Sequence, residues 1–228
     1  MTLPRNIVLA VAALAISATP DAHAGPDREK IHKQKSYVIR TPEVELAVTQ
    51  LGGHMAPVTF FRNESKPVQP YHITPWQDEK PKKVPVPVLA PLRGDFFCVP
   101  FGGNADAVGG EKHPPHGEVA GSKWDVVGSG KSGDVTSITL EMKLKAAEGS
   151  VTKQLSLVDG QNVVYAQHTI QALTGPYPLG HHATLSMPEK EGSVRFASSP
   201  IRFGMTAPGV FSDPKQKEYQ SLLPGARW

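Results

Sequence analysis

The sequence predicts an all-β fold made of short antiparallel strands. Glycine and proline are both abundant, with 21 and 22 copies in 228 residues, a composition typical of turn-rich β proteins. Apolar and polar residues alternate along several segments, most clearly over residues 138–145, which is the period of a half-buried strand. We find no helical periodicity after residue 24, so the main elements are expected to be strands.

The first half of the chain predicts several strands separated by turns and one long irregular segment. We expect strands at residues 37–39, 43–49 and 58–61, with a glycine turn at residues 51–54. The proline-rich residues 62–94 are too long and too irregular for an ordinary connection, which favours either a functional loop or a surface loop packed on itself.

The second half predicts the longer strands of the sheet. We expect strands at residues 96–101, 124–127, 138–144, 151–158 and 162–173, then short ones at 194–196 and 201–205 and one short helix at 213–219. Asp159-Gly160 joins two of these strands and is a hairpin signal, which favours antiparallel pairing.

The N-terminus has the pattern of a secretory signal peptide. Arg5 precedes an apolar run over residues 7–16, and Ala22-His23-Ala24 is a small-x-small cleavage site. The run is shorter than the about 20 residues that span a bilayer. We therefore expect a signal peptide at 1–24, a polar leader at 25–36 and a single β domain at 37–228, in a periplasmic or secreted protein with no membrane partner after cleavage. A buried core helix is the alternative for the apolar run.

Composition also limits the partners and the redox chemistry. The net charge is only +3 and the basic residues are scattered, whereas nucleic-acid binding requires a concentrated basic face. Cys98 is the single cysteine, so no internal disulfide can form, and its apolar neighbours indicate a buried hydrophobic side chain. The oligomeric state does not follow from the sequence.

Two histidine motifs carry the chemistry that the sequence suggests. His113-Pro114-Pro115-His116-Gly117-Glu118 cannot be helical, because consecutive prolines lack the amide donors a helix needs, and His181-His182 lies in a second loop-to-strand segment. An imidazole titrates near neutral pH and can give or accept a proton. Two imidazoles that face one cavity suit the ring opening of a sugar, and Tyr71 and Trp76 could supply aromatic surfaces for it.

Two other interpretations of these histidines remain open at this point. His113, His116 and Glu118, joined by His181 or His182, could form a metal site, although a loop-borne His-x-x-His-x-Glu is a weak signal. Each histidine could also be a satisfied loop or core residue.

The order of several short motifs resembles the galactose mutarotase-like superfamily, which contains the aldose 1-epimerases. The motifs are Leu51–Val58, Gly94–Asn104, Pro114–Val119 followed by Trp124, and Pro178–Leu185, so the likeness covers about residues 37–205. The resemblance implies an antiparallel β-supersandwich. It also implies an enzyme that acts on a sugar without a cofactor or a metal ion.

Two site residues follow from this resemblance position by position. His116 matches the histidine that contacts the sugar and its ring oxygen, and His182 matches the second, acid-type histidine. The expected substrate-binding residues are Asn104, His113, Trp76, Tyr71, His181 and Arg93. The arginine that the family carries after the Pro-Phe-Gly segment is either replaced by Asn104 or absent. The family's C-terminal glutamate has no counterpart in context among Glu189, Glu191 and Glu218. Three explanations stay open: a supersandwich truncated at the C-terminus, a different residue as the base, or a protein that binds a sugar without turning it over.

Three functional hypotheses follow from the sequence. The first is an exported mutarotase-like protein that binds a sugar and interconverts its anomers by histidine acid–base chemistry. The second is a carbohydrate-binding protein on the same fold that lacks catalysis. The third, which is weaker, is a metal-dependent β-fold enzyme.

Overall fold

The computed structural model describes residues 25–79, 84–195, 197–210, 212–218 and 223–228. Contacts divide the chain into two compact units, Met1–Ser186 and Met187–Trp228. The expected signal peptide lies outside the described residues, and the single domain expected over residues 37–228 stays a prediction.

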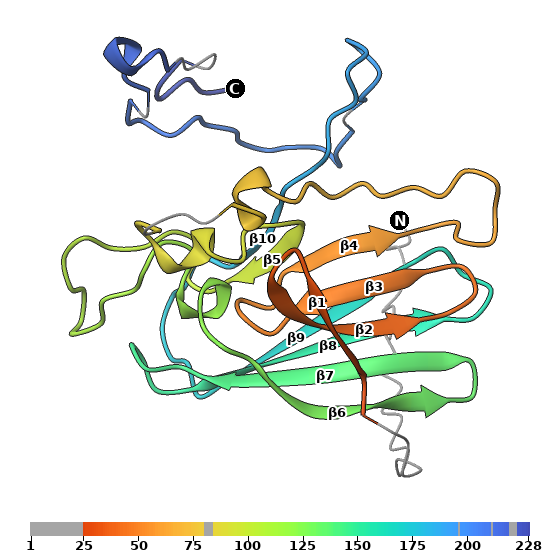
Figure 1. The fold of residues 1–228 in the computed structure, drawn as a ribbon. Helices are drawn as coiled ribbons and strands as arrows, with labels where there is room; N and C mark the ends of the chain where they lie inside the picture. Colours follow the sequence, from red (N-terminus) through yellow and green to blue (C-terminus); the bar gives the residue numbers. More distant parts are fainter. Residues whose placement is uncertain (1–24, 80–83, 196, 211, 219–222) are drawn as a thin grey trace, which may run out of the picture. The chain divides into compact units, whose positions relative to one another are not determined.

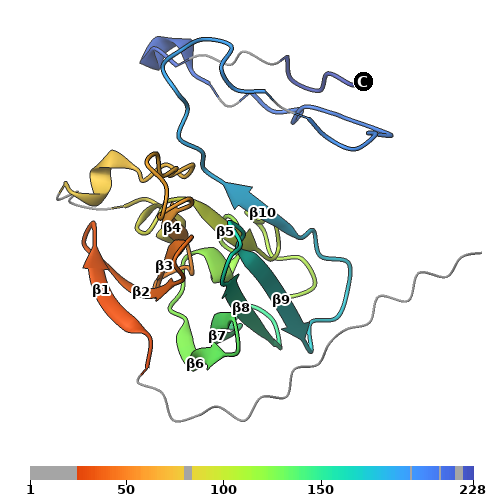
Figure 2. The ribbon, with the colours of Figure 1, turned by 90° about the vertical axis from the view of Figure 1, so that its right-hand side faces the viewer.

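The first unit contains two antiparallel sheets (Figures 1 and 2). The larger sheet has the strand order β1-β2-β3-β4-β5-β10. Its strands are β1 (Asp27–Ile31), β2 (Gln34–Arg40), β3 (Glu45–Thr49), β4 (Met55–Thr59), β5 (Asp95–Cys98) and β10 (Gly180–Ala183). The second sheet has the order β6-β7-β8-β9, with β6 (Asp125–Ser132), β7 (Val135–Lys143), β8 (Ser150–Val158) and β9 (Tyr165–Gln171). The all-β prediction is confirmed.

One hydrophobic core joins the two sheets. Leu46 and Phe97 of the larger sheet belong to the same buried cluster as Trp124, Leu140 and Leu155 of the second sheet and its entry. Burial of apolar surface is the main favourable term in folding, so these side chains fix the two sheets face to face. The alternation along β7 and β8 puts every second side chain into this core, as the sequence predicted.

Strand β5 is buried on both faces and pairs with β10, the strand that carries His181 and His182. Phe97 points into the core between the sheets, while Phe96 and Cys98 belong to a second cluster with Val88 and Ala120. Side chains alternate between the faces of a strand. Phe96 and Phe97 therefore present opposite surfaces to the neighbouring strand β10.

The polar residues 25–36 contain β1 and its turn, where the sequence predicted a polar leader. Arg40 at the end of β2 forms ion pairs with Asp27 (2.6 Å) and Glu29 across the strands. The charges therefore hold a hairpin that has little apolar surface, and hydrophobic alternation alone could not reveal it.

Short 3₁₀ helices interrupt the connections. They are η1 (Pro75–Gln77), η2 (Pro87–Leu89), η3 (Glu118–Ala120) and η4 (Pro214–Gln216). Three of them have proline in their first turn, where its missing amide costs nothing. In the described part of the chain, no helix has both the length and the apolar character needed to cross a bilayer.

The second unit differs from its predicted elements. Residues 201–205 form no strand and contribute only an isolated bridge between Met205 and Arg227. Val194 and Arg195 are likewise not in a strand, and residue 196 lies outside the described residues. The short helix expected at 213–219 is the single 3₁₀ turn η4. These side chains are mostly exposed, so burial does not select a regular structure for them.

Candidate functional site

Two histidines that are distant in sequence come together in the first unit. The ring centroids of His116 and His182 lie 5.0 Å apart, and the two rings are nearly perpendicular at 87°. His116 belongs to the loop between β5 and η3, and His182 belongs to β10. The sequence motifs therefore converge in space, as the hypothesis of a shared site requires.

The register of β10 places its two histidines on opposite faces of the sheet. His182 pairs with Phe96 and His181 pairs with Phe97. The His182 ring stacks on Phe96 at 4.8 Å and 11°, and His54 also stacks on Phe96 at 4.1 Å. Phe101 lies 5.8 Å from His116 and 6.1 Å from His182, so the histidine pair is surrounded by aromatic rings.

The loop that carries His116 is held against the end of β5. The backbone of His116 has φ +66°, in the left-handed region, and its amide donates to the carbonyl of Gly102 at 2.5 Å. Gly117 follows at φ +75°, where a Cβ atom would lie 2.1 Å from the carbonyl oxygen of Val99. Only glycine fits so close an approach, and this packing holds the backbone that carries His116 against the end of β5.

The electrostatics of the pair favour an uncharged His116. Burial, and then the proximity of His182, lower the pKa of His116 from its ordinary value. The Nδ1 atoms of His116 and His182 are buried, and neither has a hydrogen-bond partner among the described residues. A buried polar atom without a partner is costly, and a catalytic role is one of the reasons for which proteins keep such atoms. Imidazoles without internal partners keep the capacity for general acid–base chemistry.

His181 lies apart from the pair, on the face that points between the sheets. Its Nδ1 atom donates to the carboxylate of Asp95 at 2.8 Å. Its ring lies 5.0 Å from His168 and 5.6 Å from Phe97. His181, one of the expected substrate-binding residues, therefore lies on the face of β5 and β10 opposite to that of His182.

Asn104 and His113 organise the loop before His116. The side-chain oxygen of Asn104 accepts from the amide of His113 at 2.8 Å, and its amide group donates to the carbonyls of Asp106 and Glu111. His113 is only 8% exposed and donates from Nε2 to Glu111 at 2.9 Å. Asn104 and His113 both line a cavity of about 540 Å³.

The other three expected substrate-binding residues, Arg93, Trp76 and Tyr71, make contacts within the protein itself. Arg93 is completely buried, and its guanidinium donates to the backbone carbonyls of Ile31 and His32 and to the side chain of Gln77. Trp76 donates to the carbonyl of Leu89 at 2.9 Å. Tyr71 packs on the main core, and burial, followed by the charge of Asp95, raises its pKa. These contacts give each of the three a role in holding the long segment 62–94.

Sequence reasoning missed the residues that surround the pair. Phe96, Phe101 and His54 frame the histidines, and Glu111 and Tyr177 line the neighbouring cavity. Phe96 and Phe101 were visible as part of an apolar strand, but only the pairing with β10 shows which face they occupy. The two-residue period of β5 indicates only that Phe96 and Phe97 lie on opposite faces of the strand.

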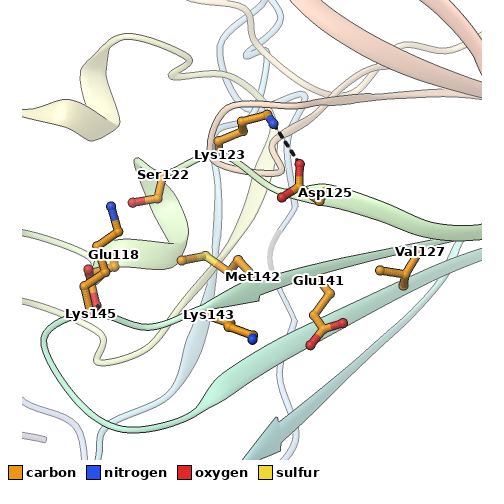
Figure 3. A pocket seen from close by; sticks show the side chains of 9 residues that line it. All are labelled: Glu118, Ser122, Lys123, Asp125, Val127, Glu141, Met142, Lys143 and Lys145. Carbon is orange, nitrogen blue, oxygen red and sulfur yellow. Dashed lines mark hydrogen bonds and ion pairs between the residues drawn. The ribbon is translucent and has the colours of Figure 1, made fainter.

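The carboxylate of Glu118, which the metal hypothesis required, is engaged elsewhere. It accepts from the amides of Lys145 (2.7 Å) and Ala146 (2.8 Å) and borders a charged cleft of about 370 Å³ (Figure 3). The same cleft contains the ion pair between Lys123 and Asp125. In the part of the chain that the structure describes, no group of three or more potential ligand side chains is arranged to hold a metal ion.

The comparisons with known proteins bear on the fold of the chain alone. The chain is similar to the Slr1438 protein of Synechocystis sp. PCC 6803, with a TM-score of 0.53 and 15% sequence identity over 82% of this chain and 62% of that one. The chain thus spans less than two thirds of the length of Slr1438. The YeaD protein of Salmonella typhimurium, provisionally described as a mutarotase, matches with a TM-score of 0.41 and 17% identity over 57% of this chain and 42% of its own. A scan against protein-family models and a search of curated proteins gave no match.

Proposed function

We propose that this protein binds a sugar beside His116 and His182 and interconverts its anomers. The observation that carries the proposal is the convergence of the two imidazoles at 5.0 Å with an unpartnered, buried Nδ1 atom on each ring. The sequence motifs that resemble the galactose mutarotase-like superfamily support the same assignment. The signal-like N-terminus further favours action in the periplasm or outside the cell.

The reaction needs one base and one acid. In our proposal neutral His116 takes the proton of the anomeric hydroxyl while His182 acts as the acid and gives a proton to the ring oxygen. The bond between the ring oxygen and the anomeric carbon breaks, and the open-chain aldehyde forms. Rotation about the neighbouring carbon–carbon bond and return of both protons then close the ring in the other anomer. The lowered pKa of His116 suits the role of the base.

The aromatic frame suits a sugar. The apolar face of a pyranose packs well on an aromatic ring, and Phe101 is 40% exposed beside both histidines. Phe96 supports the opposite side of the site by stacking on His182. A sugar that is held in this way would keep its ring oxygen and anomeric hydroxyl within reach of two proton-handling groups.

Sugar binding without catalysis is the second candidate function. Asp95 favours it, because this carboxylate bonds to His181 on the other face of β5 rather than facing the His116 and His182 pair. Among the described residues no carboxylate forms an ion pair with His116 or His182, so the two imidazoles alone would have to move both protons. A binding protein on this scaffold would need no such transfer.

Anomer exchange of aldoses distinguishes these functions. We expect the protein to accelerate the exchange, measured by polarimetry or by NMR, and His116→Asn and His182→Asn each to reduce the acceleration at least about a hundredfold. Asparagine tolerates the left-handed backbone of position 116, so the variant tests the imidazole rather than the loop. His32→Asn, at an exposed histidine with φ +44°, is the matched control and should leave the rate unchanged.

The outcomes separate the two candidates. Wild-type protein that binds aldoses without accelerating exchange would leave only the binding function. Wild-type protein that neither binds nor accelerates exchange would remove both.

A further inference from the structure

The cavity that Asn104 and His113 line shares Phe101 with the surroundings of the histidine pair. Its walls come from the loop after β5 and from the loop that leads from β9 to β10, and its volume is about 540 Å³. This lies within the range of about 300 to 1,000 Å³ that is typical of small-ligand sites. We call it the Glu111 cavity, after the one acidic side chain in its wall.

Three side chains form a hydrogen-bonded network in this cavity. One oxygen of the Glu111 carboxylate, Oε2, accepts from the hydroxyl of Tyr177 at 2.5 Å and from Nε2 of His113 at 2.9 Å. These bonds, the one from Tyr177 first, lower the pKa of Glu111, so the group is ionised at neutral pH. Its other oxygen, Oε1, has no hydrogen-bond partner among the described residues, and it is available to accept from a ligand.

One aromatic ring belongs to both sites. Phe101 lines the Glu111 cavity and also lies 5.8 Å from His116 and 6.1 Å from His182. The ring is seated against the backbone of β10, because a Cβ atom on Gly180 would lie 2.6 Å from it. A ligand on the histidine pair and a ligand in the cavity would therefore be separated by little more than this side chain.

The side chains that line the Glu111 cavity favour a neutral ligand with hydrogen-bond donors. An ionised carboxylate only accepts hydrogen bonds, so its partner must donate them, as sugar hydroxyls do, and it repels phosphates and carboxylates. Tyr177 and His113, whose rings are perpendicular at 6.0 Å, add aromatic surface. Glycines at positions 102, 103, 109 and 175 leave the backbone open to close approach.

We propose that the Glu111 cavity is a second carbohydrate subsite and that the ligand is a neutral sugar of at least two linked units. One unit lies beside the histidine pair and the next lies against Tyr177 and Glu111. The inference rests on the proposed function for the location of the first unit. It adds the class of ligand: an oligosaccharide whose reducing unit, with its free anomeric hydroxyl, lies beside the histidine pair, rather than a free or phosphorylated monosaccharide.

Calorimetric titration with glucose, maltose, cellobiose and glucose 6-phosphate tests the proposal. We expect at least one of the two disaccharides to bind about tenfold more tightly than glucose, and glucose 6-phosphate to bind no better than glucose. Glu111→Gln should weaken the binding of that disaccharide about tenfold and change the binding of glucose by less than about twofold. Glu64→Gln, at an exposed acid outside the cavity wall, is the matched control.

A second variant shows whether the network acts on the ligand. Tyr177→Phe should raise the pKa of Glu111 toward its ordinary value, followed by NMR of the carboxyl carbon, and should weaken the binding of the disaccharide. Disaccharides that bind no more tightly than glucose would overturn the subsite, as would an equal loss of both affinities in Glu111→Gln. Anomer exchange is measured separately: its absence would remove catalysis and leave the subsite standing.

Discussion

At the scale of single residues, His54 shows how a buried neutral imidazole supports the site. His54 is completely buried, its Nε2 donates to the carbonyl of Ala120 at 2.9 Å, and Nδ1 accepts from the amide of Arg93. Burial lowers its pKa to about 3. The ring stacks on Phe96, which in turn stacks on His182, so the neutral form of His54 holds the aromatic frame in place.

The buried imidazole predicts a loss of stability in mild acid. Below its ordinary pKa the histidine binds a proton in the unfolded chain but stays neutral in the folded one, so stability falls as pH falls from about 6.5 toward 3. Between pH 7 and 5 the cost from His54 is about 2 kcal/mol. Urea unfolding at both pH values should show this loss, and His54→Gln should reduce it by that amount. An unchanged pH dependence in the variant would contradict the account.

At the scale of elements, the pairing of β5 with β10 creates the site. β10 has only four residues, yet its register sends His182 to His116 and His181 to Asp95. The sequence indicated both histidine motifs, and alternation predicted β7 and β8. It could not indicate which histidine of the doublet faces which way, because that depends on pairing with a strand far away in the chain.

A comparison of two glycines tests whether the close packing of the His116 loop contributes to stability. Gly117 and Gly133 both have positive φ, but a Cβ atom on Gly117 would meet the carbonyl of Val99, whereas Gly133 has no neighbouring atom within 4 Å. Gly133→Ala should cost about 1 kcal/mol from the backbone alone. Gly117→Ala should cost at least about 2 kcal/mol more, and it should displace His116. Denaturant midpoints of the two variants measure the difference; equal losses would mean that the close approach is not needed.

At the scale of the whole molecule, Lys153 links the two sheets through the core. Its ammonium on β8 donates to the carbonyl of Gly53, in the turn between β3 and β4, at 2.5 Å, and it faces the ring of Trp124 at 5.3 Å. Alternation placed position 153 in the buried row of β8, but apolar patterning gave no reason for a lysine there. The reason is the carbonyl of Gly53, which only the packing of the two sheets brings within reach.

The buried lysine predicts a gain in stability in mild alkali. Burial lowers the pKa of Lys153 to about 8, so between this value and its ordinary pKa the unfolded chain binds more protons than the folded one. Stability should therefore rise by about 2 kcal/mol from pH 8 to 10 through this group. The free energy of unfolding is measured by urea denaturation at pH 8 and pH 10, and Lys153→Met should lose this rise of about 2 kcal/mol. A variant with the same alkaline rise as wild type would show that the ammonium is not buried.

The most direct test of the central claim is a double-mutant cycle on the histidine pair. Anomer exchange is followed by polarimetry for wild type, His116→Asn, His182→Asn and the double variant. If the two imidazoles work as one unit, each single substitution removes at least about a hundredfold of the acceleration and the double substitution removes little more. Wild-type acceleration that survives either substitution, or losses that simply multiply in the double variant, would contradict a shared site.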